Sequence, residues 1–220
     1  MKTILIPVTF LCGMLLYSCS DNDDNSKNRK IVDVPDVQIS CDGLPAVDMS
    51  DAAIVLSGAD CSENGLRNAI EQGGKILCDC GGATINISSE LQITKDVILD
   101  GGNAILDGGG STRIFHKLPE PDVDFTLQNI TLRNGRSDAA GPLYSRSGGL
   151  IMARSYDADM ALGGTLVCIN VTFENSRTAS LSESDVAGGA VYLFGVAESV
   201  FSECVFNNNR SSNGGAIGGL

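Results

Sequence analysis

Short apolar runs, separated by glycine and aspartate, dominate the chain from Lys75 onward. The first six runs span residues 76–78, 83–87, 91–93, 97–99, 104–106 and 113–115. Their starts lie six to nine residues apart. A helical crossover between parallel strands needs about a dozen linking residues or more. Alternating strand–helix–strand units are therefore excluded, and the runs predict either a β-meander or the successive strands of a coil.

A helical periodicity precedes these strands, between residues 62 and 72. The apolar positions that share one face at i, i+3 and i+4 spacing are Leu66, Ala69 and Ile70. Either Ser62 or Asp60 could cap the start of this helix, and Gly73 suits a left-handed C-cap. Because a helix of this length is not stable alone, we expect its apolar face to cover the first strands as an N-terminal cap.

Two strand units alternate and recur in the second half of the chain. The first unit occupies residues 126–134, 167–175 and 200–208, and the second occupies residues 148–151, 188–191 and 214–217. Successive copies lie 41 and 33 residues apart for the first unit, and 40 and 26 for the second. Strands that recur while their connections vary indicate a solenoid. The sequence therefore predicts an all-β, right-handed parallel β-helix over residues 51–220, with a short N-terminal capping α-helix.

Stacking of such coils brings equivalent residues into contact. Two inward stacks are expected, one of Leu127, Cys168 and Phe201 and the other of Leu132, Phe173 and Phe206. Asparagine recurs twice in the unit, at Asn129 and Asn170 in its middle and at Asn134, Asn175 and Asn208 at its end. Their amide groups could hydrogen-bond into stacking ladders, although the preference of asparagine for turns would place it at the same positions.

Composition and charge limit the classes of partner. Glycine accounts for 26 of 220 residues, and much of it falls in Asp-Gly-Gly corners and in the Gly-Gly pairs that open the second strand unit. The 27 acidic and 15 basic residues give a net charge of −12. We expect no nucleic-acid partner, because binding to phosphates needs a basic face.

The first 18 residues have the features of a signal peptide. Lys2 precedes an apolar run of 14 residues from Ile4 to Tyr17, which is shorter than the ~20 residues of a membrane-spanning helix. The sequence Leu16-Tyr17-Ser18-Cys19 resembles the lipobox of bacterial lipoproteins, which implies cleavage before Cys19 and lipidation of that residue. A cleaved signal followed by a chance cysteine is the alternative.

Polar residues after the lipobox predict a flexible tether over residues 19–50. We expect an exported protein that a lipid anchor holds in the outer membrane or at the cell surface. Six cysteines follow Cys19, and disulfides are permitted in an oxidising compartment. The disulfide candidates near the first strands are Cys41, Cys61, Cys78 and Cys80. Six cysteines allow 15 connectivities, so the pairing stays open, as does the alternative of buried free thiols.

Residues able to carry chemistry are few. Asp100 and Asp107 precede glycines at the ends of successive strands, where they could lie on one face like the two carboxylates of a glycosidase. The Asp-Gly-Gly sequence is also a strong turn signal, and we favour that interpretation. The lone His116 could be a general base, but without a partner visible in the sequence we expect it in a surface loop. We expect no catalytic residue, metal site or cofactor.

Two resemblances suggest a family. Phe-x-Asn segments (173–175 and 206–208) alternating with Gly-Gly-Ala-[Ile/Val] segments (188–191 and 214–217) resemble the repeat of polymorphic outer membrane proteins. Residues 65–135 look like the N-terminal part of pectin-lyase-like β-helix proteins. The resemblance implies an adhesin-like or structural role at the cell envelope, with a host, matrix or polysaccharide ligand.

Two other functions remain as alternatives. One is a polysaccharide lyase or glycoside hydrolase whose catalytic coils lie beyond Leu220, and the other is a non-catalytic carbohydrate-binding module. The sequence stops inside the third Gly-Gly unit, and repeat proteins need terminal caps. We therefore expect the β-helix to be incomplete at its C-terminus.

Overall fold

The computed structural model describes residues 43–118, 123–138, 140, 143–154, 163–183 and 185–219. The predicted signal peptide, the predicted lipidation site Cys19 and the disulfide candidate Cys41 lie outside these ranges.

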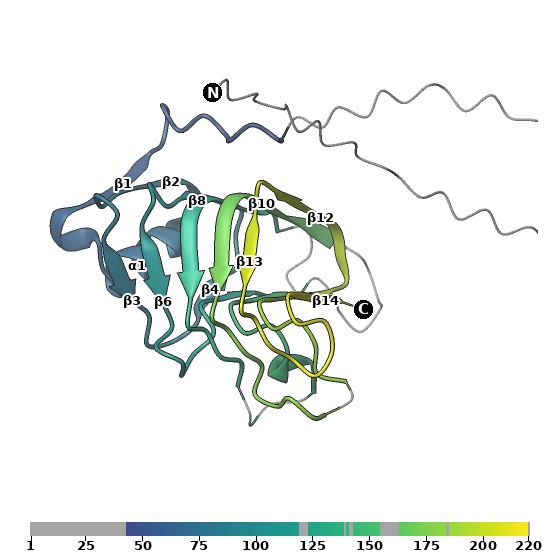
Figure 1. The fold of residues 1–220 in the computed structure, drawn as a ribbon. Helices are drawn as coiled ribbons and strands as arrows, with labels where there is room; N and C mark the ends of the chain where they lie inside the picture. The colour runs from purple at the N-terminus through teal and green to yellow at the C-terminus, as the bar shows by residue number, and fades with distance from the viewer. Residues whose placement is uncertain are drawn as a thin grey trace, which may run out of the picture. The chain divides into compact units, whose positions relative to one another are not determined.

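Two parallel sheets make up most of the described chain (Figure 1). The nine-stranded sheet contains β1 (Ile54–Ser57), β2 (Gly74–Asp79), β3 (Thr84–Asn86), β5 (Val97–Asp100), β6 (Ile105–Asp107), β8 (Phe125–Arg133), β10 (Gly163–Glu174), β12 (Val196–Ser202) and β13 (Val205–Asn207). The five-stranded sheet contains β4 (Leu91–Ile93), β7 (Phe115–Lys117), β9 (Ile151–Arg154), β11 (Val191–Phe194) and β14 (Ile217–Gly219). Every pairing between these strands is parallel, so a β-meander is excluded.

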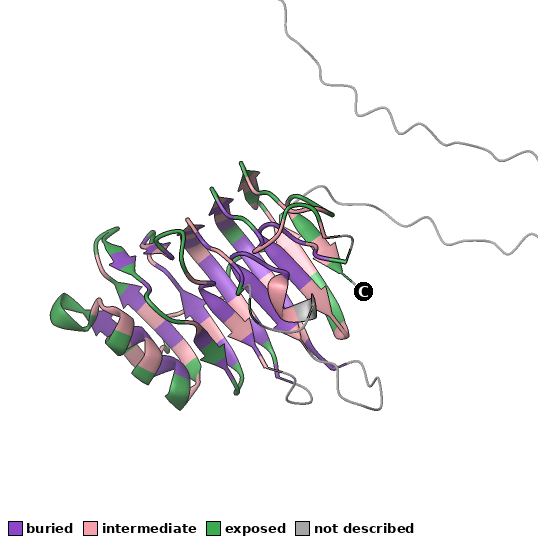
Figure 2. Ribbon diagram, turned by 90° about the horizontal axis from the view of Figure 1, so that it is seen from below, coloured by how far each residue is buried: buried purple, intermediate pink, exposed green. Residues whose placement is uncertain are grey.

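The predicted inward stacks are confirmed by the register. Cys168 on β10 pairs with Leu127 on β8 and with Phe201 on β12. Phe173 pairs in the same way with Leu132 and Phe206, and its ring stacks on that of Phe206 at a centroid distance of 4.6 Å. Figure 2 shows buried residues running through the strands of both sheets. The recurring hydrophobic positions therefore form one continuous core along the sheets.

The predicted capping helix is also confirmed, as α1 (Glu63–Gln72). Its N-cap is Ser62, whose hydroxyl accepts a hydrogen bond from the Gly65 amide at 3.2 Å. The chain leaves the helix at Gly73, which has φ +80°. The three buried helix residues are Leu66, Ala69 and Ile70. They belong to the main core, and α1 packs against β1, β2 and β4, the strands at one end of the two sheets.

Glycine permits close approach at the predicted corners. Gly102 of the first Asp-Gly-Gly corner has φ +52°, and an added Cβ would collide with the carbonyl oxygen of Cys78. In the second copy of the Gly-Gly unit, Gly188 has φ +68° and Gly189 lies against the carbonyl oxygen of Gly215 in the next copy. A side chain would be strained at the first position of this pair and would clash at the second.

Residues 43–50 pack against the nine-stranded sheet, in contrast to the predicted tether, which extended to residue 50. The Val47 amide donates to Oε1 of Gln128 at 2.8 Å, and Nε2 of Gln128 donates back to the Val47 carbonyl at 2.9 Å. The Leu44 amide donates to the Ser202 hydroxyl, and Nζ of Lys75 donates to the Asp48 carbonyl. The segment therefore crosses the sheet from β12 through β8 to β2.

Candidate ligand-binding flank

The turns that follow β3, β6, β8, β10 and β13 lie on one flank of the molecule, because these strands are neighbours in parallel register (Figure 1). Main-chain hydrogen bonds continue from the strands into the turns. The Arg136 amide donates to the Thr112 carbonyl, the Arg177 amide to the Gly135 carbonyl, and the Arg210 amide to the Ser176 carbonyl. We call this surface the turn flank.

Three arginines occupy equivalent positions on the turn flank. Isolated parallel bridges join Arg136 to Arg177 and Arg177 to Arg210. Their α-carbons therefore follow one another at about the 4.8 Å spacing of adjacent strands. Arg177 and Arg210 are exposed, and Arg136 is half-buried. Among the described residues, no ion pair or side-chain hydrogen bond engages any of these guanidinium groups. We call these residues the arginine row.

Three surface hollows lie on the turn flank, and two of them are lined by arginines of the row. The first, of about 240 Å³, is lined by Gly110, Gly135, Asn175, Ser176, Arg177, Asn208 and Arg210. The second, of about 440 Å³, shares Gly110 and Asn175 with the first and includes Asp107. The third, of about 290 Å³, includes Arg136, Asp138 and the hydroxyl residues Ser88, Ser89, Ser111 and Thr112. The turn flank thus offers guanidinium, amide and hydroxyl groups to a ligand.

Asn129 and Asn170 lie within β8 and β10, whereas Asn134, Asn175 and Asn208 directly follow β8, β10 and β13. All five predicted ladder asparagines have φ between +52° and +54°. Nδ2 of Asn170 donates to Oδ1 of Asn129 at 2.9 Å, and Nδ2 of Asn208 donates to Oδ1 of Asn175 at 2.8 Å. Asn134 instead donates to both carboxylate oxygens of Asp107. Each asparagine supplies the left-handed backbone conformation that this residue type tolerates, and side-chain hydrogen bonds link neighbouring parallel strands and the turns that follow them.

The two aspartates that could have formed a catalytic pair make local structural contacts. Asp100 accepts hydrogen bonds from the Gly102 amide and from the side chains of Gln128 and Asn129. Asp107 accepts from the Gly109 amide and pairs with Nε of Arg133 at 2.7 Å. Burial raises the pKa of Asp107, but the bonds from Gly109, Asn134 and Arg133 outweigh it and lower that pKa. Both carboxylates therefore stabilise turns, as the favoured interpretation of the sequence expected.

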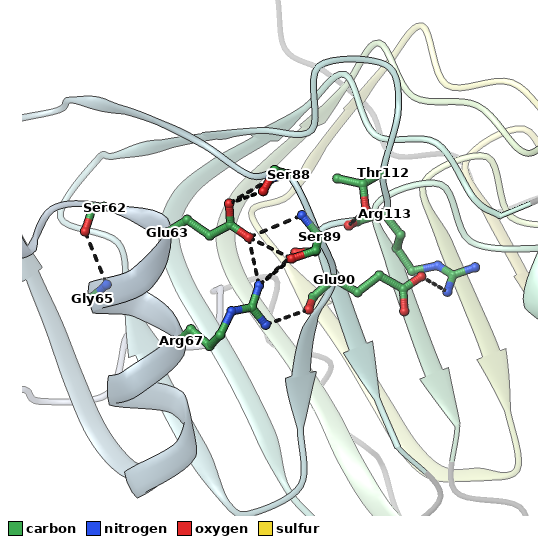
Figure 3. A network of polar contacts seen from close by, with 9 residues as sticks. All are labelled: Ser62, Glu63, Gly65, Arg67, Ser88, Ser89, Glu90, Thr112 and Arg113. Carbon is green, nitrogen blue, oxygen red and sulfur yellow. Dashed lines mark hydrogen bonds and ion pairs between the residues drawn. The ribbon is translucent and has the colours of Figure 1, made fainter.

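A polar network joins the end of the turn flank to α1 (Figure 3). The Glu63 carboxylate accepts from the amides and hydroxyls of Ser88 and Ser89 and from Nη2 of Arg67. Burial opposes ionisation, but these bonds prevail and lower the pKa of Glu63 from 4.5 to about 2. Further along the flank, Glu90 pairs with Nη1 of Arg113 at 2.7 Å. The network fixes the turn between β3 and β4.

Arg113 is buried and holds another turn in place. Its Nε donates to the Gly148 carbonyl at 2.8 Å, and its Nη2 donates to the carbonyls of Ser145 and Ser147. Glu90 also contacts His116, with 3.1 Å between Oε2 and Nδ1. The expectation of a surface-loop histidine was wrong, because His116 lies within strand β7 and its partner comes from a distant part of the chain.

The cysteine candidates have different outcomes. Cys61 and Cys80 form a disulfide with their α-carbons 5.8 Å apart. Cys78 is a free, buried thiol, so the prediction of Cys78 as a disulfide candidate was wrong. It points into the core from β2, on the opposite face from its neighbours in the strand, and burial raises its pKa to about 12. Cys168 and Cys204 are also free.

The arginine row was missed at the sequence level, although a signal for it exists. The last residue of each copy of the first strand unit begins the pattern Asn-x-Arg-[Ser/Thr], which occupies residues 134–137, 175–178 and 208–211. Extending the repeat alignment by three residues reveals it. The net charge of −12 gives no sign of a local basic feature of this size.

No protein-family model, curated protein or solved structure matches this chain. Among the described residues, no helix has the length and apolar character needed to cross a membrane. The same residues contain no group of three or more histidine, cysteine, aspartate or glutamate side chains arranged to hold a metal ion.

Proposed function

We propose that this chain is a lipid-anchored protein of the cell envelope whose right-handed parallel β-helix binds an extended ligand along the turn flank, without catalysis. The β-helix is supported by the path of the chain, which passes from one parallel sheet to the other and back from β3 to β14. Attachment through Cys19 is supported by the lipobox-like sequence.

The observation that carries the binding role is the arginine row and its adjoining hollows. Equivalent turns repeat the same polar groups at strand spacing. A ligand that itself repeats along its length can make the same contact at each turn. The aspartates of the flanking corners are engaged in structural hydrogen bonds, which favours binding over glycoside hydrolysis.

Binding of polymers to the full chain tests this proposal. Immobilised protein is exposed to a panel of acidic and neutral polysaccharides, and retention is compared with that of Arg177→Trp, Arg210→Trp and a control. Arg177 and Arg210 line the first hollow and are exposed, so a bulky side chain at either position obstructs the hollow without entering the core, and circular dichroism checks that each variant is folded. The control is Val55→Trp, at an exposed position of β1.

We expect the control to retain polysaccharide as the unmodified protein does. Loss of retention in folded flank variants supports the proposal. Retention unaffected by both variants, or release of shortened oligosaccharides by the unmodified protein, would overturn it.

A further inference from the structure

We propose that the ligand of the turn flank is a linear glycan carrying carboxylate or sulfate groups, bound through Arg136, Arg177 and Arg210; this inference rests on the proposed function. The arginines of the described chain differ in their ion pairing. Four other described arginines each pair with a carboxylate: Arg67 with Glu63, Arg113 with Glu90, Arg133 with Asp107, and Arg146 with Glu183. The three residues of the row differ from these in having no carboxylate partner within the part of the chain that the structure describes.

Stacking like charges is unfavourable unless something compensates for it. Guanidinium groups on adjacent turns repel one another, and the repulsion is largest at low ionic strength. The chain has 27 acidic residues that could supply partners. No carboxylate lines the hollow between Arg177 and Arg210. In the neighbouring hollows, the carboxylate of Asp107 is already paired with Arg133, and that of Glu90 with Arg113. The exposed Asp138 lines the same hollow as Arg136. An anionic ligand would supply the missing counter-charge.

The geometry favours anionic groups that present two oxygens side by side. A guanidinium presents paired donors that match a carboxylate or sulfate. Exposed amides of Asn175 and Asn208 lie in the same hollow and can bond to the uncharged hydroxyls of a sugar. Because the arginines follow one another across the strands, the ligand would run along the stack of coils and place successive charged groups against successive turns.

A single-stranded nucleic acid fits these features less well. Proteins that bind it combine basic grooves with aromatic side chains on which the bases stack. The residues that line the three hollows include no aromatic side chain. The overall charge of −12 would also repel a long phosphate backbone away from the row. The charged glycan is therefore the better match.

Binding of defined polymers to the full chain distinguishes these possibilities. The probes are polygalacturonate, its fully methyl-esterified neutral form, dextran sulfate, dextran and a single-stranded oligonucleotide. The variants are Arg177→Gln, Arg210→Gln, the triple substitution of all three row arginines by glutamine, and Arg177→Lys. Lys95→Gln is the matched control, because it removes one exposed positive charge near α1, where Nζ of Lys95 donates to the Glu71 carbonyl.

We expect at least one acidic glycan to bind and its neutral counterpart not to bind. Each single glutamine variant should weaken binding roughly tenfold, the effect of one charge-assisted hydrogen bond. The triple variant should abolish binding, and Arg177→Lys should retain part of it because it keeps the charge but loses the paired donors. The control should bind normally. Rising salt should weaken binding to the unmodified protein. Unchanged thermal unfolding of the variants shows that they fold.

The outcomes separate this inference from the proposed function. Equal binding of neutral and acidic glycans, unaffected by the arginine variants, would overturn the inference and leave the binding role standing. Absence of binding to every one of these polymers would overturn both. Binding of the oligonucleotide in preference to every glycan would refute the glycan class. Polygalacturonate and dextran sulfate show whether carboxylate or sulfate is preferred.

Discussion

Replacing Glu63 by glutamine tests how the helical cap is fastened to the sheets. The carboxylate accepts five hydrogen bonds from Ser88, Ser89 and Arg67, and its side chain is 18% exposed. Its pKa is about 2, against 4.5 for the free group. A difference of one pKa unit corresponds to about 1.4 kcal/mol, so ionised Glu63 contributes on the order of 3 kcal/mol to the free energy of unfolding.

The sign of the pH dependence follows from the lowered pKa. The contribution is fully present above the unfolded pKa of 4.5 and is lost as pH falls toward the folded pKa of about 2. Glu63→Gln has no charge to lose. We therefore expect the variant to be about 2–3 kcal/mol less stable than the unmodified chain at pH 7, and the difference to shrink steadily between pH 5 and pH 2.

Urea denaturation of both proteins across this pH range measures the difference. Glu71→Gln is the control, because Glu71 is exposed in the last turn of the same helix and its carboxylate forms no hydrogen bond or ion pair among the described residues. The control should differ from the unmodified protein by less than about 0.5 kcal/mol. A Glu63→Gln difference that stays constant from pH 7 to pH 2.5 would refute the electrostatic account.

Four further predictions concern the fold and the anchor. Cys80→Ser removes the crosslink to Cys61 and should lower the free energy of unfolding by about 3 kcal/mol, as should reduction of the unmodified protein in the same denaturation assay. Asn170→Ala should lower the free energy of unfolding by about 1–2 kcal/mol, because alanine is disfavoured at φ +53° and the hydrogen bond to Asn129 is lost. Asn170→Gly should lower the melting temperature less than Asn170→Ala does. Glu90→Gln should lower the free energy of unfolding by about 2–4 kcal/mol in chemical denaturation, because buried Arg113 loses its counter-charge. Glu183 forms a more exposed ion pair with Arg146, and an effect of Glu90→Gln no larger than that of Glu183→Gln would contradict this. Cys19→Ser should abolish incorporation of labelled palmitate and release the protein from membranes, and continued labelling would disprove attachment at Cys19.

Much of the local structure follows from the sequence because its signals are periodic and short in range. The spacing of Leu66, Ala69 and Ile70 is sufficient to predict a helix and its buried face. Recurrence of the strand unit aligns Leu127, Cys168 and Phe201, and the parallel register pairs these positions on neighbouring strands. Asparagine and glycine mark the positive-φ corners because few other residues tolerate that conformation.

Contacts between distant segments were not predictable in the same way. The sequence offers no reason for Cys61 to bond to Cys80 rather than to Cys78, two residues earlier. The end of β2 decides, because Cys78 is buried within the strand, whereas the strand stops at Asp79 and Cys80 lies in the following turn, where it reaches Cys61. Glu90 and His116 are likewise 26 residues apart and meet only because β4 and β7 are neighbours.

The sequence by itself determined the kind of strands, the helical cap, the corner residues and the repeat that stacks them. It also contained the Asn-x-Arg-[Ser/Thr] pattern of the arginine row. Only the tertiary structure showed that these arginines form no ion pair with the described residues, whereas Arg67, Arg113, Arg133 and Arg146 each pair with a carboxylate. Periodicity fixes which residues share a position along the stack, whereas pairing depends on which side chains from remote turns come within a few ångströms, and only the folded chain sets those distances.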